Sequence, residues 1–399
     1  MGRRYLRTIA AVLLGGALSW QIVVTGLAGL AERSANPRLL VVMGTATHPD
    51  AGALLAQALL AAGAAAKAAD VAQAVVLAAP INDRAMRVLG LATESLGNRP
   101  AGVRIMRQAA ELGWRDTPTQ LWALRDAALR DDAIPVIQRA DALARRNRST
   151  DITRAVFLAA VNEPRLRAAL ADSLALQPVW RPAFFTDVHE RLPATSTEGM
   201  EALFREMRAR RLSIAPTEWL NYIDRLIDLH DYVRARNLWA KMFAVPATRI
   251  AAAPYDSDFA LIAARPDDKP ASQFEWTVDP NLAGAVTFAG GPNGTALSIP
   301  SDLNSGTVIV SQLLILGPGV HTLTSRVGGN TGTPAAGWGI ACLPSGKDLL
   351  RRLAHGSDDA LLTLSFDIPN SGCAAQRLTL TKRDQLPART LSVEAVRIH

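Results

Sequence analysis

Residues 216–242 read PTEWLNYIDRLIDLHDYVRARNLWAKM and contain two amphipathic segments separated by a turn. Bulky apolar side chains recur every three or four positions from Trp219 to Leu226, which is the period of one helix face. His230-Asp231 interrupts the pattern, and it resumes with Ala235, Trp239 and Met242. The segment therefore predicts a pair of antiparallel helices that pack through Trp219, Tyr222, Leu226, Ala235 and Trp239.

The spacing of this hairpin resembles a tetratricopeptide repeat. Such a repeat has a bulky residue in its first helix, a small residue sixteen positions later and an aromatic residue four beyond, and Trp219, Ala235 and Trp239 match those places. Leu89-Gly90 also matches the Leu-Gly pair of the repeat's first helix. The resemblance implies a solenoid of helical hairpins that holds a peptide or a partner protein.

The rest of residues 49–245 is rich in Ala and Leu with helical periodicity. Ala69, Ala101 and Ala133 recur at intervals of 32 residues, close to the repeat length of about 34. The early units lack the opening Trp, and the spacing slips between residues 150 and 215. We expect four to six degenerate hairpins, with chance similarity in an Ala-rich region as the alternative for the early ones.

The composition changes near residues 251–271, where Pro and Asp cluster. Beyond this segment the helical period stops, and about nine short runs with β-strand character lie between Gly, Pro, Asn and Ser clusters. This pattern predicts an antiparallel β-sandwich. One helix is expected within it, from Lys347 to Ala354.

The C-terminal region is similar to the jelly-roll modules of carbohydrate-binding proteins. It is more similar to the C-terminal domains of membrane-anchored repeat proteins linked to bacterial exopolysaccharide production and export. The segments that carry the likeness are Phe274-Glu275-Trp276, Ser311-Gln312-Leu313-Leu314, Leu316-Gly317-Pro318-Gly319, Gly337-Trp338-Gly339-Ile340-Ala341-Cys342, and Cys373 with Gln376 and Leu378. The resemblance implies an envelope location and a role around glycans.

A sugar-binding sandwich needs an exposed aromatic ring for the pyranose face, with amides and carboxylates for the hydroxyl groups. Trp276, Trp338, Gln312 and Asp279 are the candidates for such a site. Because both tryptophans lie in strand-like runs, a place in the hydrophobic core is the alternative, and it carries more weight.

Cys342 and Cys373 are the only cysteines. In an oxidising compartment an even pair predicts a disulfide, with two buried free thiols as the alternative. No His pair lies near them in the sequence, so neither a metal site nor another cofactor is expected.

The N-terminus predicts export. Arg3, Arg4 and Arg7 precede an apolar run, residues 8–31, whose only strongly polar side chain is Gln21. This run is long enough to cross a bilayer, and the arginines place its N-terminal side in the cytoplasm. A cleaved signal peptide is the alternative, although the run exceeds the usual length of that segment.

Charge and motifs argue against nucleic-acid binding and known catalytic classes. The net charge of +7 is spread along 399 residues rather than gathered in one basic block. The sequence contains no His-Glu-x-x-His, no Gly-x-Ser-x-Gly and no complete phosphate loop. Runs such as Arg145-Arg146 are interpreted as solvated faces, with a lipid-headgroup or acidic-polysaccharide patch as the alternative.

The patterns predict a multidomain α + β protein with an N-terminal membrane anchor, and the resemblance implies that it lies in the bacterial inner membrane with most of its chain in the periplasm. The expected parts are a cytoplasmic tip and transmembrane anchor (1–36), a TPR-like helical domain (37–250), a linker (251–271) and a jelly-roll-like β-sandwich (272–399). The expected function is a non-catalytic scaffold for a polysaccharide synthesis or export system, with a protein on the repeats and a glycan on the sandwich. The alternatives are a pure protein-assembly adaptor and a glycan-active enzyme with an unrecognised site.

Overall fold

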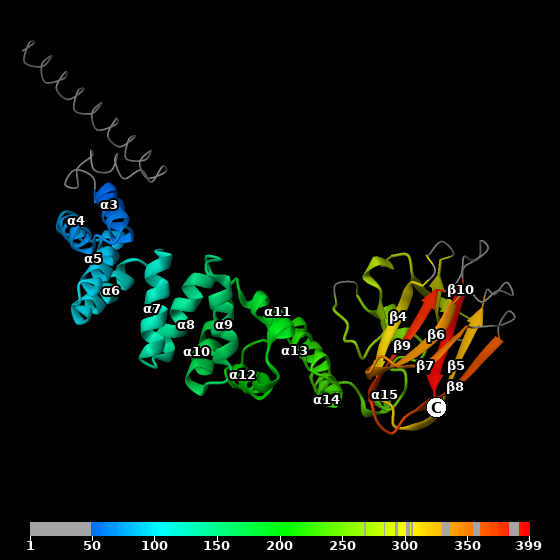
Figure 1. Cartoon of the computed structure of the whole chain (residues 1–399). Coiled ribbons are helices and arrows are strands. Elements are labelled where there is room, and N and C mark those ends of the chain that lie inside the picture. The colour runs from blue at the N-terminus through cyan, green and yellow to red at the C-terminus, as the bar shows by residue number, and fades with distance from the viewer. Residues whose placement is uncertain are drawn as a thin grey trace, which may run out of the picture. The chain divides into compact units, whose positions relative to one another are not determined.

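The computed structural model describes residues 49–266, 269–282, 284–291, 294–300, 304, 306–328, 336–353, 360–382 and 391–399 (Figure 1). The predicted membrane anchor lies outside these residues. Among the helices that are described, none combines the length and the apolar character needed to cross a membrane. The chain forms two compact units that divide between Trp180 and Arg181.

Twelve helices of the described chain form the helical region, and α3–α4, α5–α6, α7–α8 and α13–α14 pack as successive pairs (Figure 1). They are α3 (Pro49–Ala61), α4 (Ala65–Ala78), α5 (Asp83–Ser95), α6 (Arg99–Leu112), α7 (Thr117–Leu129), α8 (Ala133–Ala144), α9 (Thr150–Ala160), α10 (Pro164–Ala175), α11 (Arg181–Arg191), α12 (Thr197–Ala209), α13 (Pro216–Asp228) and α14 (Tyr232–Met242). The short 3-10 helix η1 (Ala194–Ser196) precedes α12. Helical pairing therefore extends through most of the region in which the sequence predicts it.

Local sequence signals set the helix ends. Asn82, Asn98 and Asp116 precede α5, α6 and α7, and each side chain accepts a hydrogen bond from the backbone N–H three residues later. These bonds satisfy donors that a helix start leaves unpaired. Gly63 and Gly97 have positive φ angles of 79° and 91°, a backbone geometry that favours glycine, in the turns after α3 and α5.

Two glycines let α5 and α6 approach closely. A side chain at Gly90 would place its Cβ 2.7 Å from Met106 Cγ, and one at Gly102 would place it 2.8 Å from the Gly90 carbonyl oxygen. Neither position has space for a Cβ atom. The Leu89-Gly90 pair thus serves helix packing.

Residues 216–242 form α13 and α14. Tyr222, Leu226, Ala235 and Trp239 are buried between elements of the second unit. Trp219 is partly exposed, and its ring stacks on Phe204 of α12 with centroids 4.0 Å apart. The inward face of this hairpin follows the periodicity of the sequence.

The described strands form two five-stranded antiparallel sheets, in the orders β1-β4-β9-β6-β7 and β2-β3-β10-β5-β8. The strands are β1 (Thr277–Val278), β2 (Thr287–Gly291), β3 (Gly294–Ile299), β4 (Val308–Leu314), β5 (Gly319–Gly328), β6 (Ala336–Pro344), β7 (Asp348–Leu353), β8 (Ala360–Ile368), β9 (Cys373–Lys382) and β10 (Leu391–Ile398). Helices α15 (Ala247–Ile250) and α16 (Ala260–Ala264) precede them, and the short η2 (Pro280–Leu282) follows β1. The predicted antiparallel β-sandwich is confirmed.

The helix expected from Lys347 to Ala354 is wrong, because residues 348–353 form β7. A tight turn at Pro344–Gly346 reverses the chain, and β7 then pairs with β6 from Ala341↔Asp348 to Gly337↔Leu353. Pairing with β6 satisfies backbone groups that a helix would otherwise satisfy internally. Tertiary contact therefore overrides the local helical pattern.

The predicted disulfide is confirmed. Cys342 on β6 bonds to Cys373 at the start of β9, with the two Cα atoms 4.8 Å apart. The two strands are also neighbours in the same sheet. The bond therefore crosslinks two strands that are already paired.

A polar junction joins α13 to the sandwich within the second unit. Gln273 donates to Asp224 Oδ1 of α13 at 2.9 Å, and Arg377 of β9 donates to Gln273 Oε1 at 2.8 Å. Trp239 of α14 packs on Phe274, with ring centroids 5.5 Å apart. The last helical hairpin and the sandwich thus share one interface.

Candidate binding pocket on the helical repeats

The two tryptophans predicted as a sugar platform lie in the core of the sandwich. Trp276 and Trp338 are both fully buried, and their ring centroids are 6.1 Å apart. Trp276 Nε1 donates to the carbonyl oxygen of Asp256 at 2.9 Å. Neither indole presents a face to solvent, so neither is available as the predicted platform, and the core alternative describes both.

The other two candidates differ in solvent exposure. Gln312 is buried, and its Nε2 donates to the Tyr255 carbonyl oxygen at 2.9 Å. Asp279 is partly exposed and lines a surface cavity of about 530 Å³ with Asn281, Asn304 and Thr307. Its Oδ1 accepts hydrogen bonds from Asn281 N at 2.9 Å and Nδ2 at 3.0 Å. Of the four candidates, Asp279 alone lines this cavity.

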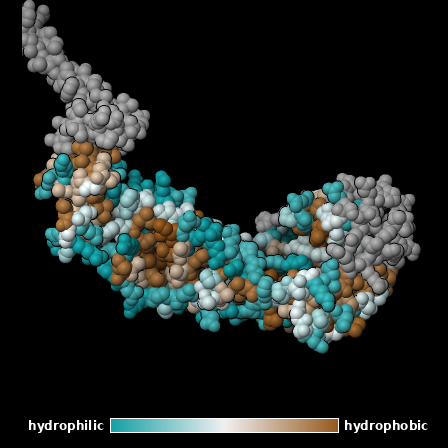
Figure 2. Space-filling model, viewed as in Figure 1, coloured by the Kyte–Doolittle hydropathy of each residue, from teal (hydrophilic) through white to brown (hydrophobic). Residues whose placement is uncertain are grey.

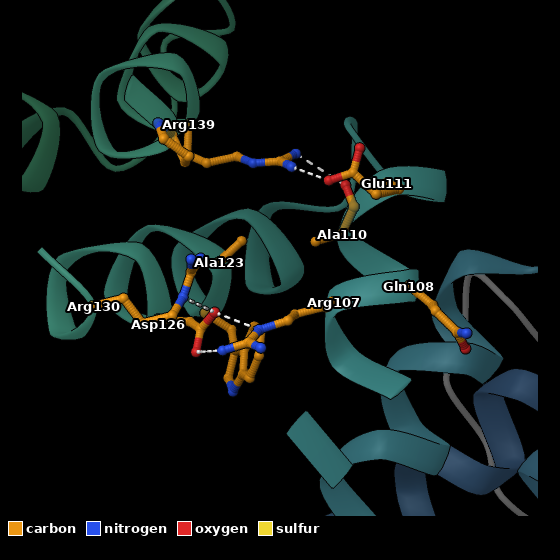
Figure 3. A pocket seen from close by; sticks show the side chains of 10 residues that line it. Arg107, Gln108, Ala110, Glu111, Ala123, Asp126, Arg130 and Arg139 are labelled. Carbon is orange, nitrogen blue, oxygen red and sulfur yellow. Dashed lines mark hydrogen bonds and ion pairs between the residues drawn. The ribbon is translucent and has the colours of Figure 1, made fainter. Parts of the chain in front are cut away.

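A second pocket, of about 340 Å³, lies between α6, α7 and α8 of the first unit (Figure 3). Each of the three helices contributes both apolar and charged side chains. The lining residues are Arg107, Gln108, Ala110, Glu111, Trp122, Ala123, Asp126, Arg130, Pro135 and Arg139. No single motif of the sequence marks this site.

Arg139 holds one wall of the pocket in place. Its guanidinium is buried and donates to the Ala110 carbonyl oxygen at 2.9 Å and to Gln120 Oε1 at 3.1 Å. It also donates to Glu111 Oε1 at 2.5 Å, the contact drawn in Figure 3. The guanidinium carbon lies 3.8 Å from the ring centroid of Trp114. One side chain of α8 therefore fixes the C-terminal end of α6.

Asp126 supplies the carboxylate of the opposite wall. Arg107 donates to its two oxygens at 2.9 and 3.1 Å, and Arg130 donates to Oδ2 at 3.2 Å (Figure 3). Burial alone would raise the pKa of Asp126, but the hydrogen bonds and charges of the two arginines outweigh it and hold that pKa below its ordinary value. The hydrogen bond that Arg107 donates to Asp126 in turn raises the pKa of Arg107. Arg107 and Asp126 therefore form a charged pair near neutral pH.

Buried arginines also connect consecutive helical pairs elsewhere. Arg87 of α5 donates to Asp116 Oδ2 at 2.7 Å and to Gln57 at 3.1 Å. Arg181 of α11 donates to both carboxylate oxygens of Glu218, at 2.6 and 2.8 Å. The sequence carried one signal for the pocket, because Arg107 and Arg139 are separated by the same 32 residues as the repeating alanines.

Within the described chain, no group of three or more His, Cys, Asp or Glu side chains is arranged to hold a metal ion.

Comparisons with known proteins identify no family for the chain. No family model matches it, and no curated protein does. Solved structures with local similarity include a CBM4 module, at 13% identity over 31% of this chain and 85% of that one, with a TM-score of 0.26. Two others have 14% identity over 31% of this chain and TM-scores of 0.23: the CBM22-1 xylan-binding domain of Xyn10C from Paenibacillus barcinonensis (84% of that chain) and a structure of accessory secretory proteins 1, 2 and 3 of Streptococcus pneumoniae (90%). At this level of similarity, the matches bear on neither the ligand nor the activity of this chain.

Proposed function

We propose that the chain is a non-catalytic adaptor of the bacterial inner membrane, with most of its mass in the periplasm, that gathers components of a polysaccharide synthesis or export system. The observation that carries the proposal is the pocket between α6, α7 and α8. A stack of helical pairs with a pocket between adjacent helices is an arrangement suited to holding a segment of another protein.

The charges of the pocket indicate the chemistry of the bound segment. Arg107 and Arg130 are about half exposed at this wall; both pair with Asp126, and Arg130 also pairs with Asp132 at 3.1 Å. Their guanidinium groups therefore remain accessible to a ligand carboxylate. Trp122, Ala123 and Pro135 supply apolar surface beside it. The expected occupant is a peptide segment in which an apolar side chain is flanked by a carboxylate.

The protonation state of Asp126 supports a binding role. A general base works best when its pKa lies near the working pH. The two arginines lower the pKa of this carboxylate and so move it further from neutral pH. A carboxylate held in three charge-assisted hydrogen bonds instead orients the guanidinium groups that meet a ligand.

The disulfide supports the proposed compartment. Cys342–Cys373 links two strands of one sheet, and such bonds persist mainly in exported or periplasmic proteins. The predicted N-terminal anchor leads to the same location.

We assign the glycan contact of the sandwich to the cavity beside Asp279. Asn281, Asn304 and Thr307 line it with amide and hydroxyl groups, which can donate to and accept from sugar hydroxyls. The tryptophans take no part in this contact, because both are in the core.

Site-specific photocrosslinking in the native host tests the protein-binding part. A photoreactive residue replaces Gln108 in the pocket, and a control chain carries it at the exposed Arg125 of α7, outside the pocket. Crosslinking from position 108 alone to a component of polysaccharide synthesis or export supports the proposal. Crosslinking only to division or general envelope-assembly proteins would favour the pure assembly adaptor. Equal crosslinking yields at both positions would show that the pocket does not bind the partner.

A titration of the full chain with the host's purified surface polysaccharide tests the glycan part. Thr307→Ala removes a hydroxyl from the cavity, and Thr363→Ala makes the same change at an exposed position on β8. Weaker binding in the first variant alone supports the assignment. If the unaltered chain does not bind, the sandwich holds no sugar and the chain is a protein adaptor only.

A further inference from the structure

Four loops of the first unit lie in succession along one edge of the helical pairs. They connect α4 to α5, α6 to α7, α8 to α9, and α10 to Trp180, and contacts link each to the next. Between the first two loops, a Cβ atom added to Gly113 would lie 2.9 Å from Asp83 Cβ. Between the second and third, Arg146 donates to the main-chain oxygen of Arg115. Between the third and fourth, Trp180 Nε1 donates to Oδ1 of Asp141, in the last turn of α8, at 2.7 Å. We call this surface the loop edge.

The loop edge exposes large apolar side chains. Ile81, Leu176 and Val179 are 83%, 72% and 77% exposed, and Trp114 is 41% exposed. The helices beside these loops also carry apolar surface, which Figure 2 shows near α8 and α9. Isolated exposed apolar residues are ordinary on a protein surface, and others, such as Leu96 and Leu129, lie at the opposite ends of the helices. The loop edge differs because its exposed apolar side chains lie in loops that contact one another and that also carry arginines.

The same edge carries unneutralised positive charge. Arg115, Arg146 and Arg148 are exposed, and none of them forms an ion pair with another described residue. Among the neighbouring acids, Asp116 binds Arg87 at 2.7 Å and Asp141 binds Arg145 at 2.8 Å, which leaves Asp83 to offset one of the three positive charges. Three cationic side chains therefore stand beside the exposed apolar ones.

We propose that the loop edge docks on a bilayer surface that contains anionic phospholipid. The interfacial region of a bilayer accepts aliphatic side chains and an indole ring, while its anionic headgroups attract arginine. A soluble polyanion would engage the arginines but would leave Ile81, Leu176 and Val179 in water.

The length of chain before α3 supports this partner. Residues 32–48 separate the end of the apolar run from Pro49, and 17 residues reach about 60 Å at most when fully extended. The predicted anchor would thus keep the loop edge within a short distance of the membrane, which raises its effective concentration there. The proposal adds a second, reversible membrane contact to the predicted span.

Hydrogen exchange of the full chain in lipid nanodiscs tests the proposal. One set of discs contains phosphatidylcholine, and the other contains an equal mixture of phosphatidylcholine and phosphatidylglycerol. We expect amides of the four loops to exchange more slowly in the anionic discs. Replacing Arg115, Arg146 and Arg148 by Gln lowers the docking equilibrium about fivefold for each arginine, or about a hundredfold together, and the slowing disappears.

Two further variants separate charge from apolar contact. Arg104, Arg125 and Arg165 are exposed residues of α6, α7 and α10, and changing these three to Gln removes the same charge while retaining the slowing. The double variant Leu176→Ser, Val179→Ser should lose the slowing of exchange in the anionic discs, although every arginine remains. Equal exchange in both kinds of disc would overturn the proposal. So would slowing by soluble polygalacturonate without lipid, which would make the loop edge a glycan surface.

Discussion

Replacing Arg139 by methionine should loosen the contact between α8 and the C-terminal end of α6. Methionine keeps most of the apolar contact of the side chain but loses the hydrogen bonds to the Ala110 carbonyl oxygen and Gln120 Oε1. A hydrogen bond to a charged group contributes about 1.5–3 kcal/mol, and both acceptors are buried. The exposed partner Glu111 adds less than about 1 kcal/mol. We expect a loss of about 3–5 kcal/mol in the local stability of the first unit.

Native-state hydrogen exchange measures this loss where it occurs. Because about 1.4 kcal/mol corresponds to a factor of ten, the slow amides of α6 and α8 should exchange about two to four orders of magnitude faster in Arg139→Met. Arg145→Met is the matched control, since Arg145 is exposed and pairs with Asp141 one turn away, and it should cost less than about 1 kcal/mol. Equal effects of the two substitutions would refute the anchoring role of Arg139.

Three other predictions concern the second unit. Replacing Cys342 and Cys373 by Ser should destabilise the sandwich by about 3–4 kcal/mol, because the bond closes a loop of 31 residues, and denaturant melts followed by tryptophan fluorescence measure this loss. Trp338→Ala should lower the stability of the sandwich by about 3–5 kcal/mol while any polysaccharide binding by the folded fraction persists, since the indole is in the core; loss of binding in a chain of normal stability would contradict this placement. Burial raises the pKa of Asp224, and the hydrogen bond from Gln273 offsets only part of that effect. The folded chain thus keeps a proton that the unfolded chain releases, so stability falls as pH rises from the ordinary carboxyl pKa through the raised one. Asp224→Asn should therefore stabilise the second unit at neutral pH but not in acid, and melting curves across pH would show the opposite sign if the carboxylate were favourably paired.

The helical part of the fold could be predicted because helix periodicity is a local property. The apolar positions from Trp219 to Trp239 are spaced for two facing helices, and the residues that the pattern turns inward, such as Tyr222 and Ala235, are buried. The disulfide could also be predicted, because the chain has two cysteines and its N-terminus predicts export to an oxidising compartment. In β7, by contrast, pairing with β6 decides the structure, and residues 348–353 alone do not show it.

The ligand-facing residues of the sandwich were harder to predict. A tryptophan in a strand can face the core or the solvent, and the sequence around Trp276 and Trp338 does not fix which side of each strand is covered. The packing of the two sheets settles it, with both rings inside. Asp279 lines a cavity because it lies between the end of β1 and the start of η2, where the chain leaves the sheet.

The helical pocket was missed because no single segment encodes it. Arg107, Asp126 and Arg139 come from three helices, and each of them alone is an ordinary charged residue of an amphipathic helix. The interval of 32 residues between the two arginines becomes informative only when hairpins of that length stack.

The proposed adaptor role requires the pocket of the helical repeats to recruit a partner needed for polysaccharide output. Ala123→Leu places a larger side chain in the pocket, and Ala128→Leu makes the same change at an exposed position of α7. Each variant replaces the native chain in its host, and cell-surface polysaccharide is measured relative to the amount of folded chain. The account predicts that output falls sharply with Ala123→Leu and stays normal with Ala128→Leu. Normal output from both variants at normal chain levels would contradict it.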